Sequence, residues 1–99
     1  MAKFVQIIEF STSRIDEVQA AGDEWREATK GQTTASWEIV AADRDQPNRY
    51  MLIVSFPSYD DAQKNNELPA TATVAEKMAK LCDGEPIFRN LDVMSEESF

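Results

Sequence analysis

Two segments of this chain are apolar on both faces of an extended strand. In residues 49–56, one face carries Tyr50, Leu52, Val54 and Phe56, and the other carries Met51 and Ile53. In residues 3–10, Phe4, Ile8 and Phe10 alternate with Val5 and Ile7. A strand that is apolar on both faces is typical of the centre of a sheet that is covered on both sides. The chain is therefore expected to fold around a sheet, with a layer against each face.

Helical patterns supply one of these layers. Ser13 followed by Asp16 resembles a capping box, Gly31 provides a stop, and the segment between them carries an apolar stripe at helical spacing. A second helix starts at Ser58 with Asp61, and Leu68-Pro69 interrupts it, because proline disfavours helix in the residue before it. The pattern therefore predicts two pieces, the second over residues 69–82.

Further strands are predicted from residues 33–42 and 86–94. Trp37, Ile39 and Ala41 alternate with Ser36, Glu38 and Val40, and the turn formers in residues 43–48 join this strand to residues 49–56 as a hairpin. In the last strand, Ile87, Leu91 and Val93 share one face. Residues 95–99 form a short acidic tail.

The order of these elements predicts an α+β fold of the ferredoxin-like βαββαβ type. It has a four-stranded antiparallel sheet with the helices on one face, in a single domain over residues 1–99. Nothing in the chain remains to cover the second sheet face, so a second copy is the simplest cover, as in a dimeric α/β barrel. The alternative is that this face is only partly apolar and tolerates water.

Composition limits the partners. The chain has 99 residues, a formal net charge of −8, no His and one Cys. The acidic excess argues against nucleic acid and anionic membranes as partners. The longest apolar runs have four residues, too few to cross a bilayer, and residues 1–10 lack a secretory pattern, so a cytoplasmic location is expected. Cys82 has no Cys or His partner for a disulfide or a metal site, and no metal or other cofactor is expected.

Three segments resemble small antibiotic-biosynthesis-monooxygenase-like proteins of the dimeric α/β-barrel superfamily: residues 58–62, 65–69 and 88–93. The group includes cofactor-independent oxygenases that act on aromatic polyketides, haem-degrading enzymes and many uncharacterised members. The resemblance implies a pocket between sheet and helices with an Asn near the second helix, for which Asn65 or Asn66 is the counterpart. The Trp that accompanies this Asn is missing here, and so is the axial His of the haem-degrading members.

Five residues are candidates for binding a ligand: Trp37, Tyr50, Asn65, Asn66 and Arg89. Each has an ordinary structural alternative. Trp37, expected on an edge strand, could line a pocket or pack at the dimer contact. Tyr50 could be a hydrogen-bonded structural side chain, and Asn65 and Asn66 could be helix caps. Arg89 could pair with a Glu or Asp on the sheet. Trp25 is expected in the core, Cys82 as an inert thiol, and no carboxylate stands out as a general base.

Two functional hypotheses follow. The first is a dimeric protein that binds a small hydrophobic, aromatic or polyketide-like ligand without catalysis. The second is a cofactor-independent monooxygenase acting on an aromatic substrate, with Trp37, Tyr50 and Asn66 at its site.

Overall fold

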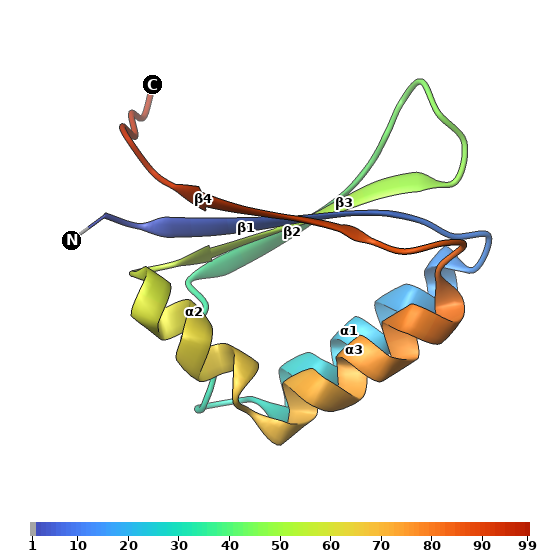
Figure 1. The fold of residues 1–99 in the computed structure, drawn as a ribbon, viewed down its shortest axis with the longest axis horizontal. Helices are drawn as coiled ribbons and strands as arrows, with labels where there is room; N and C mark the ends of the chain where they lie inside the picture. The colour runs from blue at the N-terminus through green and yellow to red at the C-terminus, as the bar shows by residue number, and fades with distance from the viewer. Residues whose placement is uncertain (1) are drawn as a thin grey trace.

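The computed structural model describes residues 2–99 and contains seven regular elements in the order βαββααβ (Figure 1). They are β1 (Phe4–Ser11), α1 (Ile15–Ala28), β2 (Trp37–Ala42), β3 (Arg49–Phe56), α2 (Tyr59–Asn66), α3 (Pro69–Leu81) and β4 (Ile87–Asp92). The expected strands and helices are all present. The break at Leu68-Pro69 is confirmed, because Pro69 takes the first helical position of α3, where its missing N–H costs nothing.

The four strands form one antiparallel sheet in the order β2-β3-β1-β4. The two strands with apolar residues on both faces, β1 and β3, are the central pair, as predicted. All three helices lie on one side of the sheet (Figure 1). The ferredoxin-like arrangement is therefore confirmed, with the second helical connection divided into α2 and α3.

The predicted N-cap of α2 is confirmed, whereas that of α1 is not. The Ser58 hydroxyl accepts a hydrogen bond from the Asp61 backbone N–H at 3.2 Å, which is the expected N-cap of α2. The expected cap of α1 by Ser13 is wrong. The helix starts at Ile15, and the buried Thr12 hydroxyl accepts from the Arg14 backbone N–H instead, while donating to the Leu81 carbonyl.

Strand β2 starts at Trp37, four residues later than the expected Thr33. The Thr33 and Thr34 side chains before it bind α2, and of residues 33–36 only Ser36 bonds to the sheet, at the Ser55 carbonyl. The Thr33 hydroxyl donates to the Asn65 side-chain oxygen at 2.8 Å, and the Thr34 hydroxyl donates to the Asp61 carbonyl at 2.5 Å. These side-chain bonds compete with the backbone ladder of the sheet, so the strand is shorter than its composition suggests.

The core is concentrated at the ends of the helix-facing side of the sheet. One cluster, beneath α2, consists of Phe4, Val54, Phe56 and Ala62. At the opposite end of β1, the buried Phe10 ring stacks on Tyr50 with 5.7 Å between ring centroids. In the described part of the chain, no helix is long and apolar enough to cross a membrane.

The opposite side of the sheet, here called the outer face, has no covering element in residues 2–99 (Figure 1). The strand register places these side chains on it: Val5, Ile7, Glu9, Ser11, Trp37, Ile39, Ala41, Arg49, Met51, Ile53, Ser55, Ile87, Arg89 and Leu91. Its apolar character agrees with the sequence. Exposed fractions of 46% for Trp37 and 50% for Ile39 show that these side chains are open to solvent in the isolated chain.

Candidate ligand site on the helix-facing side of the sheet

Two adjacent rows of side chains cross the middle of the helix-facing side. The register aligns Glu38, Val54, Gln6 and Asn90 in one row, called here the polar row. It aligns Val40, Leu52, Ile8 and Phe88 in the next, the apolar row. Every strand contributes one side chain to each row, so the two rows extend across the full width of the sheet.

The helices bury Val54 but leave other side chains in the middle of this side partly open. Gln6, Ile8 and Leu52 lie on the two central strands, with strands on both sides, yet all three remain partly exposed. Helix α2 covers one end of the sheet, and the α1–α3 pair lies toward the other (Figure 1). At the β4 edge of the apolar row, the Phe88 ring is 57% exposed. Solvent therefore reaches an apolar surface that a filled core would exclude.

Glu38 is the charged member of the polar row. Arg26 of α1 donates from Nη1 to Oε1 of Glu38 at 3.0 Å and also pairs with Asp23. The Glu38 side chain is only 22% exposed. Burial raises the pKa of Glu38, and the charge and hydrogen bond of Arg26 oppose that shift. The carboxylate is thus partly withdrawn from water, and its hydrogen bond to Arg26 at Oε1 leaves the other oxygen open to a further donor.

The other polar side chains of the row are neutral amides. Gln6 Nε2 donates to Asn90 Oδ1 at 3.1 Å. Gln6 lies two strand spacings, about 10 Å, from Glu38. Hydrogen-bonding groups therefore stand at both ends of a surface that is otherwise apolar.

The sequence-predicted candidates divide between several locations. Tyr50 lies on the helix-facing side one row beyond Leu52, partly buried against Phe10. Asn65 is 6% exposed, and its side chain accepts the Thr33 hydrogen bond, so it ties α2 to the segment before β2. Asn66 is exposed at the last position of α2.

The other two candidates, Trp37 and Arg89, lie on the outer face. Arg89 Nη2 donates to Glu9 Oε2 at 3.3 Å, which is the ordinary ion pair that the sequence offered as the alternative. Trp37 on edge strand β2 and Arg89 on edge strand β4 are separated by both central strands. Within one chain, neither residue shares a surface with Tyr50.

Glu38, Gln6 and Phe88 had not been singled out from the sequence. Glu38 alternates with Trp37 and Ile39, so it reads as an ordinary polar residue of an edge strand. The sequence feature that could have identified Glu38 is that it shares a strand face with Val40, on the side opposite Trp37. That pattern becomes informative only once the helices are known to lie on this side.

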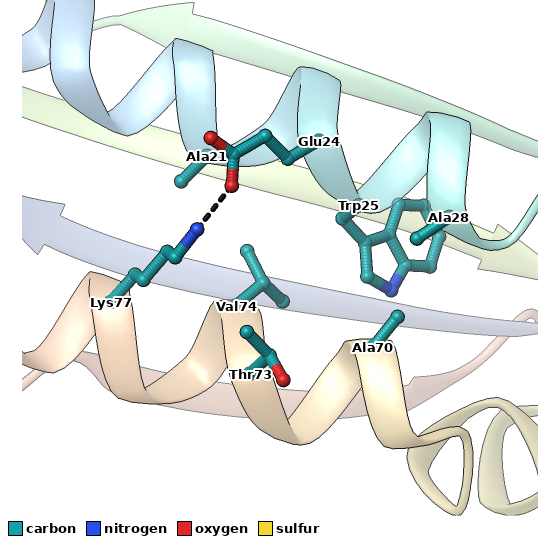
Figure 2. Close-up of a pocket in the computed structure, with 8 residues that line it drawn as sticks. All are labelled: Ala21, Glu24, Trp25, Ala28, Ala70, Thr73, Val74 and Lys77. Carbon is teal, nitrogen blue, oxygen red and sulfur yellow. Dashed lines mark hydrogen bonds and ion pairs between the residues drawn. The ribbon is translucent and has the colours of Figure 1, made fainter.

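The concavity drawn in Figure 2 lies elsewhere, in a shallow groove between α1 and α3 with the strands behind the helices. Its volume is about 170 Å³, and alanines from both helices line it together with Trp25 and the ion pair of Glu24 and Lys77. Small-molecule sites ordinarily occupy about 300–1,000 Å³. Trp25 Nε1 donates to the Thr71 hydroxyl at 2.9 Å, and the side chain is half-buried at the groove instead of lying in the core as expected. This part of the groove is smaller than an ordinary small-molecule site, whereas its continuation past Lys80 and Leu81 has a volume of about 350 Å³.

Cys82 and the acidic residues offer no metal chemistry in the part of the chain that is described. No group of three or more Cys, Asp or Glu residues there could hold a metal ion. Cys82 is a partly buried free thiol at the C-terminal end of α3. Burial, together with the negative charge of Asp83, raises the pKa of the Cys82 thiol.

The same fold is found in solved structures of predicted antibiotic biosynthesis monooxygenases and of a cofactor-independent oxygenase. No family model and no curated protein sequence matches the chain. The similarity to known proteins was found among solved structures. A predicted antibiotic biosynthesis monooxygenase from Caulobacter crescentus is similar with a TM-score of 0.83 and 10% identity, over 95% of this chain and 92% of that one.

Two further structures have the same fold. SnoaB, a cofactor-independent oxygenase from Streptomyces nogalater, is similar with a TM-score of 0.82 and 12% identity, over 97% of each chain. A predicted antibiotic biosynthesis monooxygenase from Nitrosomonas europaea has a TM-score of 0.79 and 15% identity, over 94% of this chain and 91% of that one. At such low identities the likeness establishes the fold and leaves the activity open.

Proposed function

We propose that this protein binds a small aromatic or polyketide-like ligand on the helix-facing side of its sheet. The observation that carries the proposal is the partly exposed apolar row on the central strands, with polar groups beside it. The row spans four strands, about 14 Å, which is long enough for a ligand of two or three fused rings. A mostly apolar surface with a few polar groups is the usual composition of a ligand site.

Binding can be tested with 2-naphthol as the probe and two-dimensional NMR of the labelled protein. We expect shifts concentrated at the helix-facing residues Ile8, Leu52 and Phe88. Phe88→Ala removes an exposed ring, so it should weaken binding roughly tenfold with little effect on stability. Ile87→Ala is the matched control, because Ile87 neighbours Phe88 on β4 but lies on the outer face. Shifts confined to the α1–α3 groove, or no shifts at all, would contradict the proposal.

We also propose that the outer face pairs with a second copy of the chain. Exposed apolar side chains on this face include Ile39, Met51 and Leu91, and a contiguous apolar surface of this kind marks an interaction site. The face carries two arginines and one glutamate, although the whole chain has a net charge of −8. The acidic excess therefore lies elsewhere and does not oppose the approach of two such faces.

The shape of the molecule also supports this pairing. The loop between β2 and β3 and the C-terminal tail both rise from the sheet on the side away from the helices (Figure 1). A second copy seated on the outer face would lie between them. In that arrangement Trp37 would belong to the dimer contact.

A second candidate function is cofactor-independent oxygenation of an aromatic substrate. The shared fold with SnoaB and the position of Tyr50 beside the apolar row favour it. Oxygen consumption with a panel of hydroxylated polycyclic aromatics tests the activity. Tyr50→Phe and Asn66→Ala should reduce the rate at least tenfold if these residues act on the substrate, whereas the exposed Tyr59→Phe should not. Binding of the panel without oxygen consumption would favour the purely binding role.

A further inference from the structure

We infer that Glu38 and Arg26 restrict the ligand to neutral aromatic molecules that carry a hydrogen-bond-donating hydroxyl group. This inference rests on the proposed binding function and concerns the same surface. It assigns a specificity-determining role to Glu38, the carboxylate at the end of the polar row next to Val40.

The first step is the distribution of charge on this surface. The helix-facing positions of the four strands contain two acidic residues, Glu38 and Asp92, and no Lys or Arg. Arg26 reaches this side from α1, and it already pairs with the carboxylates of both Glu38 and Asp23. A carboxylate ligand placed on the apolar row would thus meet negative charge without an uncommitted cation.

The second step concerns cationic ligands. Arg26 already compensates the Glu38 charge at 3.0 Å, so an ammonium group would have to compete with it. The ammonium would also have to leave water for a surface made by Val40, Leu52, Ile8 and Phe88. Removing a charge from water without a dedicated partner is costly. A neutral molecule avoids that cost.

The third step concerns the hydroxyl group. Ionised carboxylates only accept hydrogen bonds, and Arg26 Nη1 contacts one of the two oxygens of Glu38, Oε1. The side chain is 22% exposed, and no buried side-chain oxygen in the described part of the chain lacks a partner, so solvent or a ligand can reach the second oxygen of Glu38. A hydroxyl donor from a ligand on the adjacent apolar row would take the place of water at that oxygen. Hydrogen bonds to charged acceptors are among the stronger ones in proteins.

The experiment compares three probes of one ring size: 2-naphthol, 2-methoxynaphthalene and 2-naphthoate. Titration calorimetry at neutral pH should show 2-naphthol binding about tenfold more tightly than its methyl ether, which cannot donate. It should show 2-naphthoate as the weakest of the three. Equal affinity for all three probes would overturn this inference and leave the proposed binding function intact. Failure of all three to bind would overturn both.

Two substitutions separate the roles of acceptor and charge. Glu38→Leu removes the acceptor, so 2-naphthol and its methyl ether should bind to within about twofold of each other. Glu38→Gln keeps an acceptor and removes the charge, so 2-naphthoate should bind about tenfold more tightly than it does to the unmodified protein. Glu24→Gln, in the α1–α3 groove, is the matched surface control and should change none of these ratios. Altered ratios in Glu24→Gln, or unaltered ratios in both Glu38 variants, would overturn the assignment.

Discussion

Burial raises the pKa of both Glu38 and Cys82. The charges next to the two side chains differ, so the raised pKa has a different effect on each. At Glu38, beside an accessible apolar row, the charge and hydrogen bond of Arg26 oppose the rise in pKa. Cys82 has the opposite setting, because Asp83 adds a negative charge and the C-terminal end of α3 contributes the unfavourable end of the helix dipole. One residue can engage a ligand, whereas the other is held as a neutral thiol.

Cys82 should therefore react slowly with alkylating agents. A raised pKa means that less thiolate is present at any pH below it, and the thiolate is the reactive form. With iodoacetamide at pH 8, the folded protein should react several-fold more slowly than the same protein in urea. Asp83→Asn should increase the folded-state rate, whereas Glu85→Gln, which changes a charge that does not act on the thiol pKa, should leave it unchanged. Equal rates in folded and unfolded protein would contradict this assignment.

At the scale of single elements, the two helix starts show how a local signal and its surroundings compete. Ser58 and Ser13 both stand three residues before an Asp, which is the same sequence signal. Ser58 caps α2, whereas α1 has no side-chain cap. Its N-cap residue is Arg14, whose backbone N–H donates to the Thr12 hydroxyl, and that hydroxyl donates to the Leu81 carbonyl at 2.7 Å. The Thr12 bonds join the start of α1 to the end of α3. A tertiary contact thus fixes the start of α1 in place of a side-chain cap.

This difference predicts unequal costs for two matched substitutions. Ser58→Ala should lower the free energy of unfolding by about 1 kcal/mol, because it removes the cap of α2 and the bond to the Asp61 carboxylate. Ser13→Ala should change it by less than about 0.5 kcal/mol, because Ser13 is exposed and caps nothing. Urea unfolding followed by circular dichroism measures both. Equal losses would show that the two serines play the same role.

At the scale of the whole molecule, a four-stranded sheet with three helices on one side leaves a large apolar surface uncovered. The core beneath α2 is small, and several apolar side chains of the outer face are exposed in the isolated chain. Pairing through the outer face would bury the same side chains in both copies. It would also give the central strands the second covering layer that their sequence pattern calls for.

The dimer proposal predicts opposite outcomes for two neighbouring residues of β2. Ile39→Asp places a charge at the centre of the proposed contact, so it should weaken association at least thirtyfold, about 2 kcal/mol. Val40→Asp is the matched control, because Val40 faces the helices and should leave association unchanged. Light scattering across a dilution series should give twice the 11.2 kDa chain mass for the unmodified protein. A monomer at every concentration, or a dimer that Ile39→Asp leaves intact, would contradict the pairing.

Much of the fold was predictable because its signals are local. Alternation within residues 49–56 identified a central strand, and Pro69 divided the second helix at the observed position. The start of β2 was less predictable, since the Thr33 and Thr34 hydroxyls bind groups on α2 that are distant in sequence. For the same reason the role of Asn65 as a tie between segments was not evident.

The candidate site was predicted only in part. Tyr50 lies on the side that faces the helices, whereas Trp37 and Arg89 lie on the outer face. Sequence alternation tells which residues of one strand share a face. It does not tell which faces of different strands coincide, because that depends on the pairing register and on the side to which the helices cross.

By itself, the sequence determined the order and type of the elements, the central position of β1 and β3, and the excess of apolar surface. These properties depend on side-chain size, alternation and backbone preference over a few residues. The tertiary structure alone decided that Glu38 meets Arg26 beside Val40 and Leu52 and that Trp37 faces away from them. Those outcomes require segments distant in the chain to come together, and the burial that raises the pKa of Glu38 exists only after they have done so.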